Sequence, residues 1–535
     1  MTHPEQAAAS SLTRARRWWR GADLEERLFA AVFGVLAVLA LIPIWRARFL
    51  PLLDQPNHLS SAYIWHHYDD PAARLKEHYE LNIRPVPYFA YYGLVHLFAL
   101  AFATSVEIAN KIALSAYVLA IPVAGLLFAA RTGRSPWLSL LTFPLAYSYS
   151  WAHGFNPFTI GVAALLLAIC AVDAFLARPR ASAGPGAGVL ILTLACALSH
   201  PLALFGQNAS AIALLAAIRP RWKTVLALGL LVLPGNLLFA WQLLRPQVSL
   251  AEGAIGQEQL YVGQHPPPWE MLRYLPAYTL DSVSGNADLT VFYVLFGTAI
   301  LLLLTSFPKS NRSANSGDWL RRWRGAAVLM AMLACYLIIP LHLTRPIEWW
   351  FVSGRFAPLV GFFLFLLPDG PIRGARLLLL LPALAAAAFY PVHVSQKYAG
   401  FNQRAEPFIK MVEEARPGAK ILFLSLKPRG DEAVNVDAYH QFGCYIQITK
   451  GGYCATGWFK NGFPYKLRSE LPAPPWHRHE LFNARDHAGP YDYVIVRNEN
   501  SKKPIFNGQE NPEWGAVRRE GAWTLYARQS EPERP

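Results

Sequence analysis

The stretch LFAAVFGVLAVLALIPIWRARFLPLLDQPNHLSS, residues 28–61, contains an apolar run followed directly by a polar loop, and it indicates the fold of this chain. Residues 28–45 carry no charge, and their number is close to the roughly 20 residues with which a helix crosses a bilayer. The basic residues 1–27 lack a cleavage site of small residues, which predicts a cytoplasmic tail and an uncleaved first span. Polar chemistry begins directly after that span, because Asp54 and His58 follow in the next loop.

The composition of the whole chain predicts a polytopic α-helical membrane protein. Of 535 residues, 53% are hydrophobic and only 16% are charged, against about 25% charged residues in soluble domains. Apolar runs near bilayer length recur along the chain and predict about 11–13 transmembrane helices. The run 86–103 contains three tyrosines and a histidine, so we expect it to lie at the membrane interface or to re-enter.

The net charge of +14 comes from basic clusters between the apolar runs rather than from one patch. That distribution follows the positive-inside rule, so it predicts orientation and argues against a nucleic-acid partner. The rule places the N-terminus in the cytoplasm and residues 46–87 outside, as a first periplasmic loop. We therefore expect a multi-pass protein of the bacterial inner membrane whose C-terminal part is periplasmic.

The chain divides into a transmembrane domain, residues 28–394, and a soluble α/β domain, residues 395–535. Near Gln396 the apolar runs give way to shorter alternating segments. Apolar residues at helical spacing predict a helix over 406–414. Strands are predicted at ILFLSL (421–426), YDYVIVRNE (491–499) and AWTLYARQ (522–529).

Two of the five cysteines, Cys444 and Cys454, fall in the predicted soluble domain. A disulfide between them suits a periplasmic location, and two free thiols are the alternative. Their spacing does not resemble that of a zinc site.

The loop after the first span holds the clearest chemical signal. Pro56 suits the first turn of a helix with Asp54 at or just before its cap, and the pair Asp69 and Asp70 before a proline would end it. Such a surface-lying helix would hold Asp54 at the outer membrane surface, with His58 one turn further along. The alternative interpretations are a helix cap for Asp54 and a solvated pair for Asp69 and Asp70.

Further polar residues are predicted on the same outer side of the membrane. They are His153 and Asn156 in HGFNPF, His200 in SHP, and Arg345, Glu348 and Arg355 in TRPIEWWFVSGR. Arg355 falls within an apolar run, where an unpaired guanidinium is costly. It would either pair with Glu348 or bind an anionic headgroup. The histidines would otherwise be ordinary polar groups at turns.

A carboxylate, several histidines and arginines at one membrane depth suit an enzyme with a lipid-phosphate substrate. Arginines such as Arg355 and Arg345, together with His200, would bind the phosphate, and Asp54 would act as a general base. His58, Asp69, Asp70, His153, Asn156 and Glu348 are further candidate site residues. The sequence requires no metal, and a divalent ion is left open.

The layout resembles the GT-C superfamily of integral membrane glycosyltransferases that use polyprenyl-phosphate sugars. The resemblance covers the order of tail, span, acidic loop, further spans and C-terminal α/β domain, and it rests in sequence on Asp54 within LLDQPNH. It implies that Asp54 is the catalytic base, or a ligand of a metal or of the acceptor. It also implies a polyprenyl-phosphate-linked donor and inverting transfer to a lipid, glycan or protein acceptor. Many members have a second acidic residue beside the first, whereas Gln55 follows Asp54 here.

Two alternatives remain at this stage. An O-antigen-type polymerase or ligase also uses outer-face arginines, but such proteins often lack the C-terminal domain. A lipid or sugar transporter would show internal repeats and charges near the bilayer midplane, and the sequence has no convincing repeat.

Overall fold

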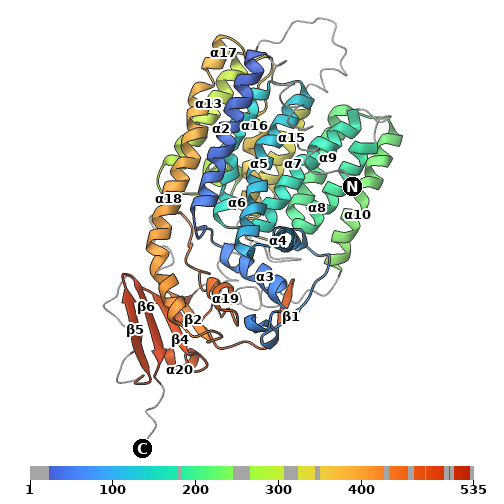
Figure 1. Cartoon of the computed structure of the whole chain (residues 1–535). Coiled ribbons are helices and arrows are strands. Elements are labelled where there is room, and N and C mark those ends of the chain that lie inside the picture. The colour runs from blue at the N-terminus through green and yellow to red at the C-terminus, as the bar shows by residue number, and fades with distance from the viewer. Residues whose placement is uncertain are drawn as a thin grey trace, which may run out of the picture.

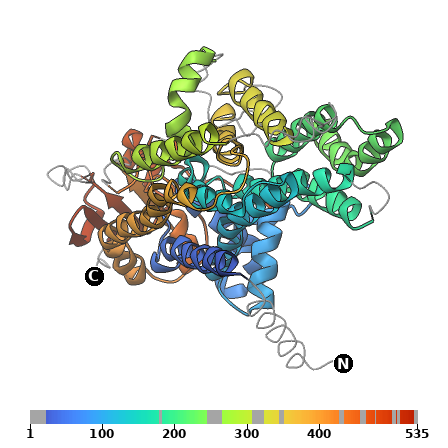
Figure 2. The same ribbon diagram turned by 90° about the horizontal axis from the view of Figure 1, so that it is seen from above.

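In the computed structural model, long helices run side by side and an α/β layer covers one end of them (Figure 1). The structure describes residues 23–177, 183–244, 265–306, 323–343, 350–426, 433–455, 463–475, 478–498, 505–506 and 511–529. A view down the bundle places α8–α10 at one side and α18 with the C-terminal strands at the other (Figure 2).

Seven helices of the described residues are long and apolar enough to cross a membrane. They are α2 (Leu24–Arg46), α5 (Val106–Thr132), α7 (Asn156–Ala177), α9 (Pro201–Ile218), α10 (Trp222–Leu243), α13 (Ala287–Leu304) and α17 (Ala375–Leu378) with α18 (Leu381–Glu414). Shorter apolar segments are α4 (Phe89–Ala101), α8 (Ala183–Ser199), α15 (Arg324–Ile338) and η6 (Ser353–Phe356) with α16 (Ala357–Phe365). The chain is a multi-pass membrane protein, as its composition predicts.

Helix α4 differs from the long helices in both length and direction. Its 13 residues span about 20 Å, which is short of the roughly 30 Å of a bilayer core. Figure 1 shows it end-on, whereas the long helices lie along the bundle axis. This arrangement fits the interfacial position expected for residues 86–103.

A buried 3₁₀ segment, η3 (Pro136–Tyr147), packs against α2, α5, α16 and α18. Pro144 lacks an N–H, and Thr142 Oγ1 donates to the carbonyl of Ser139 at 2.7 Å, so regular α-helical bonding is interrupted. The segment leads into α6 (Tyr149–Ala152), directly before the turn that holds His153.

The C-terminal layer contains a four-stranded sheet in the order β2-β4-β6-β5. The strands are β2 (Ile421–Ser425), β4 (Tyr493–Arg497), β5 (Trp514–Glu520) and β6 (Trp523–Arg528). β2 and β4 are parallel and the other pairs are antiparallel. Three strands lie where the sequence predicts them, and β5 was not predicted because most of its residues are polar or small.

Helix α18 joins the membrane bundle to this layer without a break. The boundary placed between residues 394 and 395 falls inside the helix, so the division into domains stays a prediction. Near its C-terminal end, Phe408 packs against Phe423 and Trp523 of the sheet.

Helix α3 (Gln55–His67) lies between the bundle and the C-terminal layer. α19 (Cys444–Lys450) packs on it, and β1 (Tyr79–Leu81) pairs antiparallel with β3 (Tyr465–Leu467). The expectation of a surface-lying helix is therefore wrong: most of α3 is buried, because the C-terminal layer covers it. Short elements complete the layer: η1 (Pro71–Ala73), η2 (Leu75–Glu77), η7 (His479–Leu481) and α20 (Ala484–His487), while α12 (Pro268–Thr279) precedes α13.

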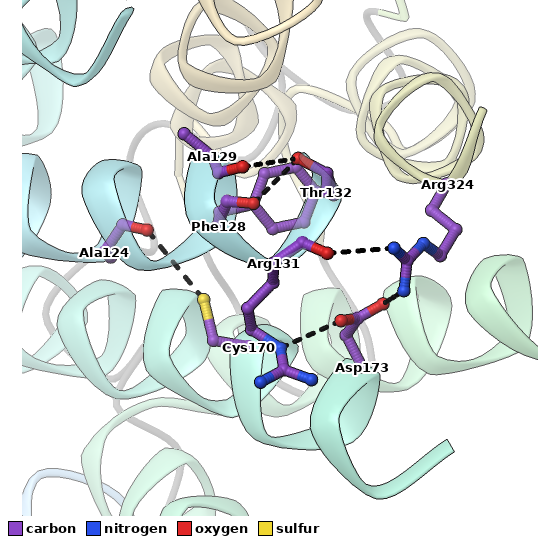
Figure 3. A network of polar contacts seen from close by, with 8 residues as sticks. All are labelled: Ala124, Phe128, Ala129, Arg131, Thr132, Cys170, Asp173 and Arg324. Carbon is purple, nitrogen blue, oxygen red and sulfur yellow. Dashed lines mark hydrogen bonds and ion pairs between the residues drawn. The ribbon is translucent and has the colours of Figure 1, made fainter. Parts of the chain in front are cut away.

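The opposite end of the bundle is held by ion pairs around one buried carboxylate. Asp173 of α7 is fully buried and accepts from Arg131 of α5 at 2.9 Å and from Arg324 of α15 at 2.6 Å (Figure 3). Arg324 also donates to the Arg131 carbonyl at 3.0 Å. The cluster ties three helices together at this end.

Candidate active site

The backbone of Asp54 is fixed against the turn between α6 and α7. The Asp54 N–H donates to the His153 carbonyl at 3.0 Å, and the Leu53 N–H to the Ala152 carbonyl at 3.1 Å. Gly154 makes this approach feasible: a Cβ there would lie 2.7 Å from the Gln55 nitrogen and 2.8 Å from the Asp54 nitrogen. Its φ of +68° also favours glycine.

The Asp54 side chain does not cap α3, although Asp54 is the N-cap residue. Instead, its Oδ1 accepts a hydrogen bond of 2.9 Å from Gln441 Nε2. The side chain lies deep in the protein yet keeps partial solvent access. Burial raises the pKa of Asp54 to about 7, although Arg355 and the Gln441 hydrogen bond act to lower it. Asp54 can therefore hold or release a proton near neutral pH.

Arg355 of η6 is a buried cation beside this carboxylate. Its Nη1 lies 3.2 Å from His200 Nε2, and its Nη2 donates to the Trp350 carbonyl at 3.0 Å. Its guanidinium carbon stands 3.7 Å from the centre of the Phe155 ring. Within the described part of the chain, no carboxylate lies within ion-pair distance of Arg355, and its buried Nε has no hydrogen-bond partner.

The His200 ring lies directly against this guanidinium. His200 is the N-cap of α9, and its Nδ1 lies 3.1 Å from the backbone nitrogen of Leu202. A guanidinium can only donate, so the contact at 3.2 Å between Arg355 Nη1 and His200 Nε2 is a hydrogen bond when Nε2 accepts. The N–H groups of Arg355 are the charged donors at this point, and an anionic oxygen would bind to them.

Three further predicted residues lie in the same region. His58 Nδ1 lies 2.7 Å from the Tyr92 hydroxyl, and burial, with Arg355 nearby, lowers its pKa to about 3. His153 Nδ1 lies 3.0 Å from the Tyr149 carbonyl, and burial lowers its pKa to about 4. Asn156 Nδ2 donates to Gln55 Oε1 and, at 3.1 Å, to the Tyr91 hydroxyl. Both imidazoles are thus neutral near pH 7, and the positive charge belongs to Arg355.

Solved structures of ArnT from Cupriavidus metallidurans share this architecture. The apo structure aligns with a TM-score of 0.51 and 9% identity, over 94% of this chain and 98% of ArnT. The structure bound to undecaprenyl phosphate aligns with a TM-score of 0.51 and 10% identity over the same shares. The chain therefore shares the fold of ArnT. The sequence itself matches no family model and no curated relative.

Not every predicted residue lies in this region. Asp69 and Asp70 are exposed beyond the far end of α3, about 20 Å along the helix from Asp54. Asp69 pairs with Lys76 at 2.6 Å, and Asp70 accepts the Ala72 N–H at 2.9 Å. The structure therefore does not bring this pair to Asp54. Arg345 and Glu348 lie outside the described residues.

The fold also brings in residues that sequence reasoning missed. Gln441 contacts Asp54 across 387 residues of chain, and no local motif marks it. Tyr92 of α4 lies at hydrogen-bond distance from His58 because α4 packs against α3. Gln55 could be noted from the sequence only because it follows Asp54 at a position where a second acidic residue could stand.

Two cavities adjoin the site. One of about 20 Å³ lies between α5, α7 and α16, and Arg355, Ser148 and Ser150 line it together with apolar side chains. Another of about 220 Å³ is lined on its polar side by Arg48, Gln55, Glu107 and Lys111. Across the described ranges, no group of three His, Cys, Asp or Glu side chains could hold a metal ion. The sulfurs of Cys444 and Cys454 lie 2.6 Å apart, and a disulfide between them stays a prediction.

Proposed function

We propose that the protein is a membrane glycosyltransferase that moves a sugar from a polyprenyl-phosphate carrier to an acceptor. The observation that carries this proposal is the buried guanidinium of Arg355, which lies against His200 and beside a protonatable Asp54. A buried cation with no carboxylate partner among the described residues suits the phosphate of a lipid carrier. The shared fold and the undecaprenyl phosphate bound to ArnT support the same donor class.

The proposed reaction is a direct displacement at the anomeric carbon. An acceptor hydroxyl oxygen forms the new bond to that carbon, and the bond from the carbon to the phosphate oxygen breaks. The electron pair leaves with the polyprenyl phosphate, where Arg355, with His200 beside it, stabilises the added negative charge. The acceptor proton passes to Asp54, and the configuration inverts. No step requires a metal.

The proposed location is the periplasmic face of a bacterial inner membrane. Basic residues Arg131 and Arg324 lie at one end of the bundle, and the positive-inside rule assigns that end to the cytoplasm. Asp54, Arg355 and the C-terminal layer lie at the other end. The acceptor is a lipid, a glycan or a protein, and membrane lipids surround the bundle.

The test is a transfer assay with the full chain in nanodiscs and a panel of undecaprenyl-phosphate sugars. Mass spectrometry measures undecaprenyl phosphate released in the presence of an envelope extract as acceptor source. The Asp54→Asn substitution should lower this release by about 10²- to 10⁴-fold, the usual contribution of a general base. Asp486→Asn, the same change at an exposed position of α20, should leave it unchanged.

A different pattern would reject the proposal. If Asp54→Asn releases undecaprenyl phosphate at the original rate, Asp54 is not the base. If the sugar lipid crosses the bilayer of a proteoliposome without being cleaved, the protein is a transporter and the glycosyltransferase assignment fails.

A further inference from the structure

Gln441 reaches Asp54 from the C-terminal part of the chain. It lies in the turn before α19, is fully buried, and donates from Nε2 to Asp54 Oδ1 at 2.9 Å. The other carboxylate oxygen, Oδ2, accepts no hydrogen bond from the described residues. Gln441 thus binds one oxygen of the carboxylate and leaves the second available.

The docking of α19 on α3 fixes the position of Gln441. Its carbonyl accepts the Cys444 N–H at 3.0 Å at the start of α19. Ser60 of α3 donates to Gln447 Oε1, and Gln447 Nε2 donates to the Tyr79 hydroxyl at 2.8 Å. The contact between Gln441 and Asp54 is therefore supported by the hydrogen-bonded interface between α3 and α19, and it does not depend on the Gln441 side chain alone.

The amide oxygen of Gln441 is buried without a hydrogen-bond partner among the described residues. A buried amide oxygen normally has a partner, so an unpaired one beside a reactive carboxylate points to a donor supplied by a ligand. A reacting hydroxyl has one hydrogen, which Asp54 would take. The ligand must then carry a second donor close to the reacting hydroxyl, as the neighbouring hydroxyls of a sugar do.

We propose that Gln441 is a positioning residue, which orients Asp54 through its amide N–H and binds a second hydroxyl of a glycan acceptor through its amide oxygen. This inference rests on the proposed function and adds an acceptor class to it. The C-terminal layer then forms part of the active site and is more than a cover over it.

The charged and titratable surroundings of Asp54 define what a change at Gln441 would do. They are His58 from α3, Tyr88 before α4, His153 before α7, His200 before α9, Arg355 from η6, and Asp437 and His440 on the segment that carries Gln441. Of these, Arg355 acts directly on the pKa of Asp54, together with the Gln441 hydrogen bond itself. Both lower it, so loss of the hydrogen bond must raise it.

The first test is an infrared titration of the Asp54 carboxyl band in the full chain, with the Asp54→Asn spectrum subtracted. Gln441→Leu should move the midpoint upward from about 7, by about one pH unit for the loss of a hydrogen bond to a charged group. Gln441→Glu places a second carboxyl beside Asp54 and should move it further. Gln207→Leu removes a buried glutamine bonded to Thr193, away from Asp54, and should leave the midpoint unchanged.

The second test measures transfer to octyl glycosides as acceptor probes. Gln441→Leu should raise the acceptor KM about tenfold, leave the donor KM unchanged, and move the acid limb of kcat/KM to higher pH. An unchanged infrared midpoint for both variants would overturn the inference, as would equal changes in both KM values. If Gln441→Leu does not fold, Gln441→Glu carries the infrared test. Activity of Asp54→Asn would reject the proposed function, whereas the infrared titration would still test the contact.

Discussion

The two ends of α7 hold two different clusters of buried charge. At one end Asp173 is bonded to Arg131 and Arg324, so each charge has an opposite partner (Figure 3). At the other end, about 26 Å away along the helix from Asp173 to Asn156, Arg355 faces a histidine, a carbonyl and an aromatic ring. No carboxylate of the described residues completes that second cluster.

This difference distinguishes a structural cluster from one that is prepared for a ligand. A buried ion pair that loses one partner is strongly destabilised, so the closed cluster at Asp173 is expected to contribute to folding. A buried cation without an ion partner lowers the stability of the unliganded protein. An anion that binds to the cation offsets this loss of stability. Substitutions at the Asp173 end are therefore expected to change stability, and substitutions at the Arg355 end to change ligand binding.

The largest effect should follow from Asp173→Leu. It leaves Arg131 and Arg324 without their shared carboxylate and should lower the free energy of unfolding by about 3–5 kcal/mol. Equilibrium unfolding in mixed micelles measures this loss. Transfer per folded molecule should be unchanged, and a loss of transfer would show that this end has more than a structural role.

Arg355→Met should weaken the binding of undecaprenyl phosphate by about 10- to 100-fold, which corresponds to about 1.5–3 kcal/mol for hydrogen bonds to a charged group. Native mass spectrometry with this lipid measures the change. Arg324→Met is the matched control, and it should lower stability without affecting lipid binding. If Arg355→Met destabilises the fold and still binds the lipid normally, Arg355 has a structural role and does not bind the phosphate.

Gly154 and Gly133, at opposite ends of the bundle, both have a positive φ and allow a matched pair of substitutions. Gly154→Ala strains a positive φ and drives a Cβ to within 2.7 Å of the Gln55 nitrogen, and it should cost about 1–3 kcal/mol together with most of the transfer activity. Gly133→Ala strains a similar φ of +70° with no atom within 4 Å of the new Cβ. It should lower the melting temperature alone. Equal losses of transfer in both variants would contradict the proposed position of Asp54.

The smallest effect is a dependence on pH. Asp54 must be ionised to accept a proton, and its pKa is raised to about 7, so kcat/KM should rise about tenfold from pH 6 to pH 8. Binding of undecaprenyl phosphate depends on the cation Arg355 and should change less over this range. A rate that is flat between these values would show that another group is the base.

Several parts of this structure could be predicted from residues close in sequence. The spans follow from apolar runs of bilayer length, and strands β2, β4 and β6 follow from short apolar segments. His200 was expected at a tight turn, and it is the residue between α8 and α9. In each case the conformation of the segment depends mainly on its interaction with the bilayer or with residues close to it in sequence.

Other parts could not be predicted because they depend on packing between distant segments. The burial of α3 requires α19, which lies almost 400 residues later in the chain. Asp69 and Asp70 have the residue types of a catalytic pair, yet the length of α3 carries them away from Asp54.

The sequence by itself determined that this chain spans the membrane and places Asp54 just outside its first helix. It did so because hydrophobic length and the charges between spans act locally, one segment at a time. Only the tertiary structure decided which groups surround Asp54. Arg355, His200 and Gln441 come from three separate elements, and their positions depend on how helices and loops pack, which no single stretch of sequence encodes.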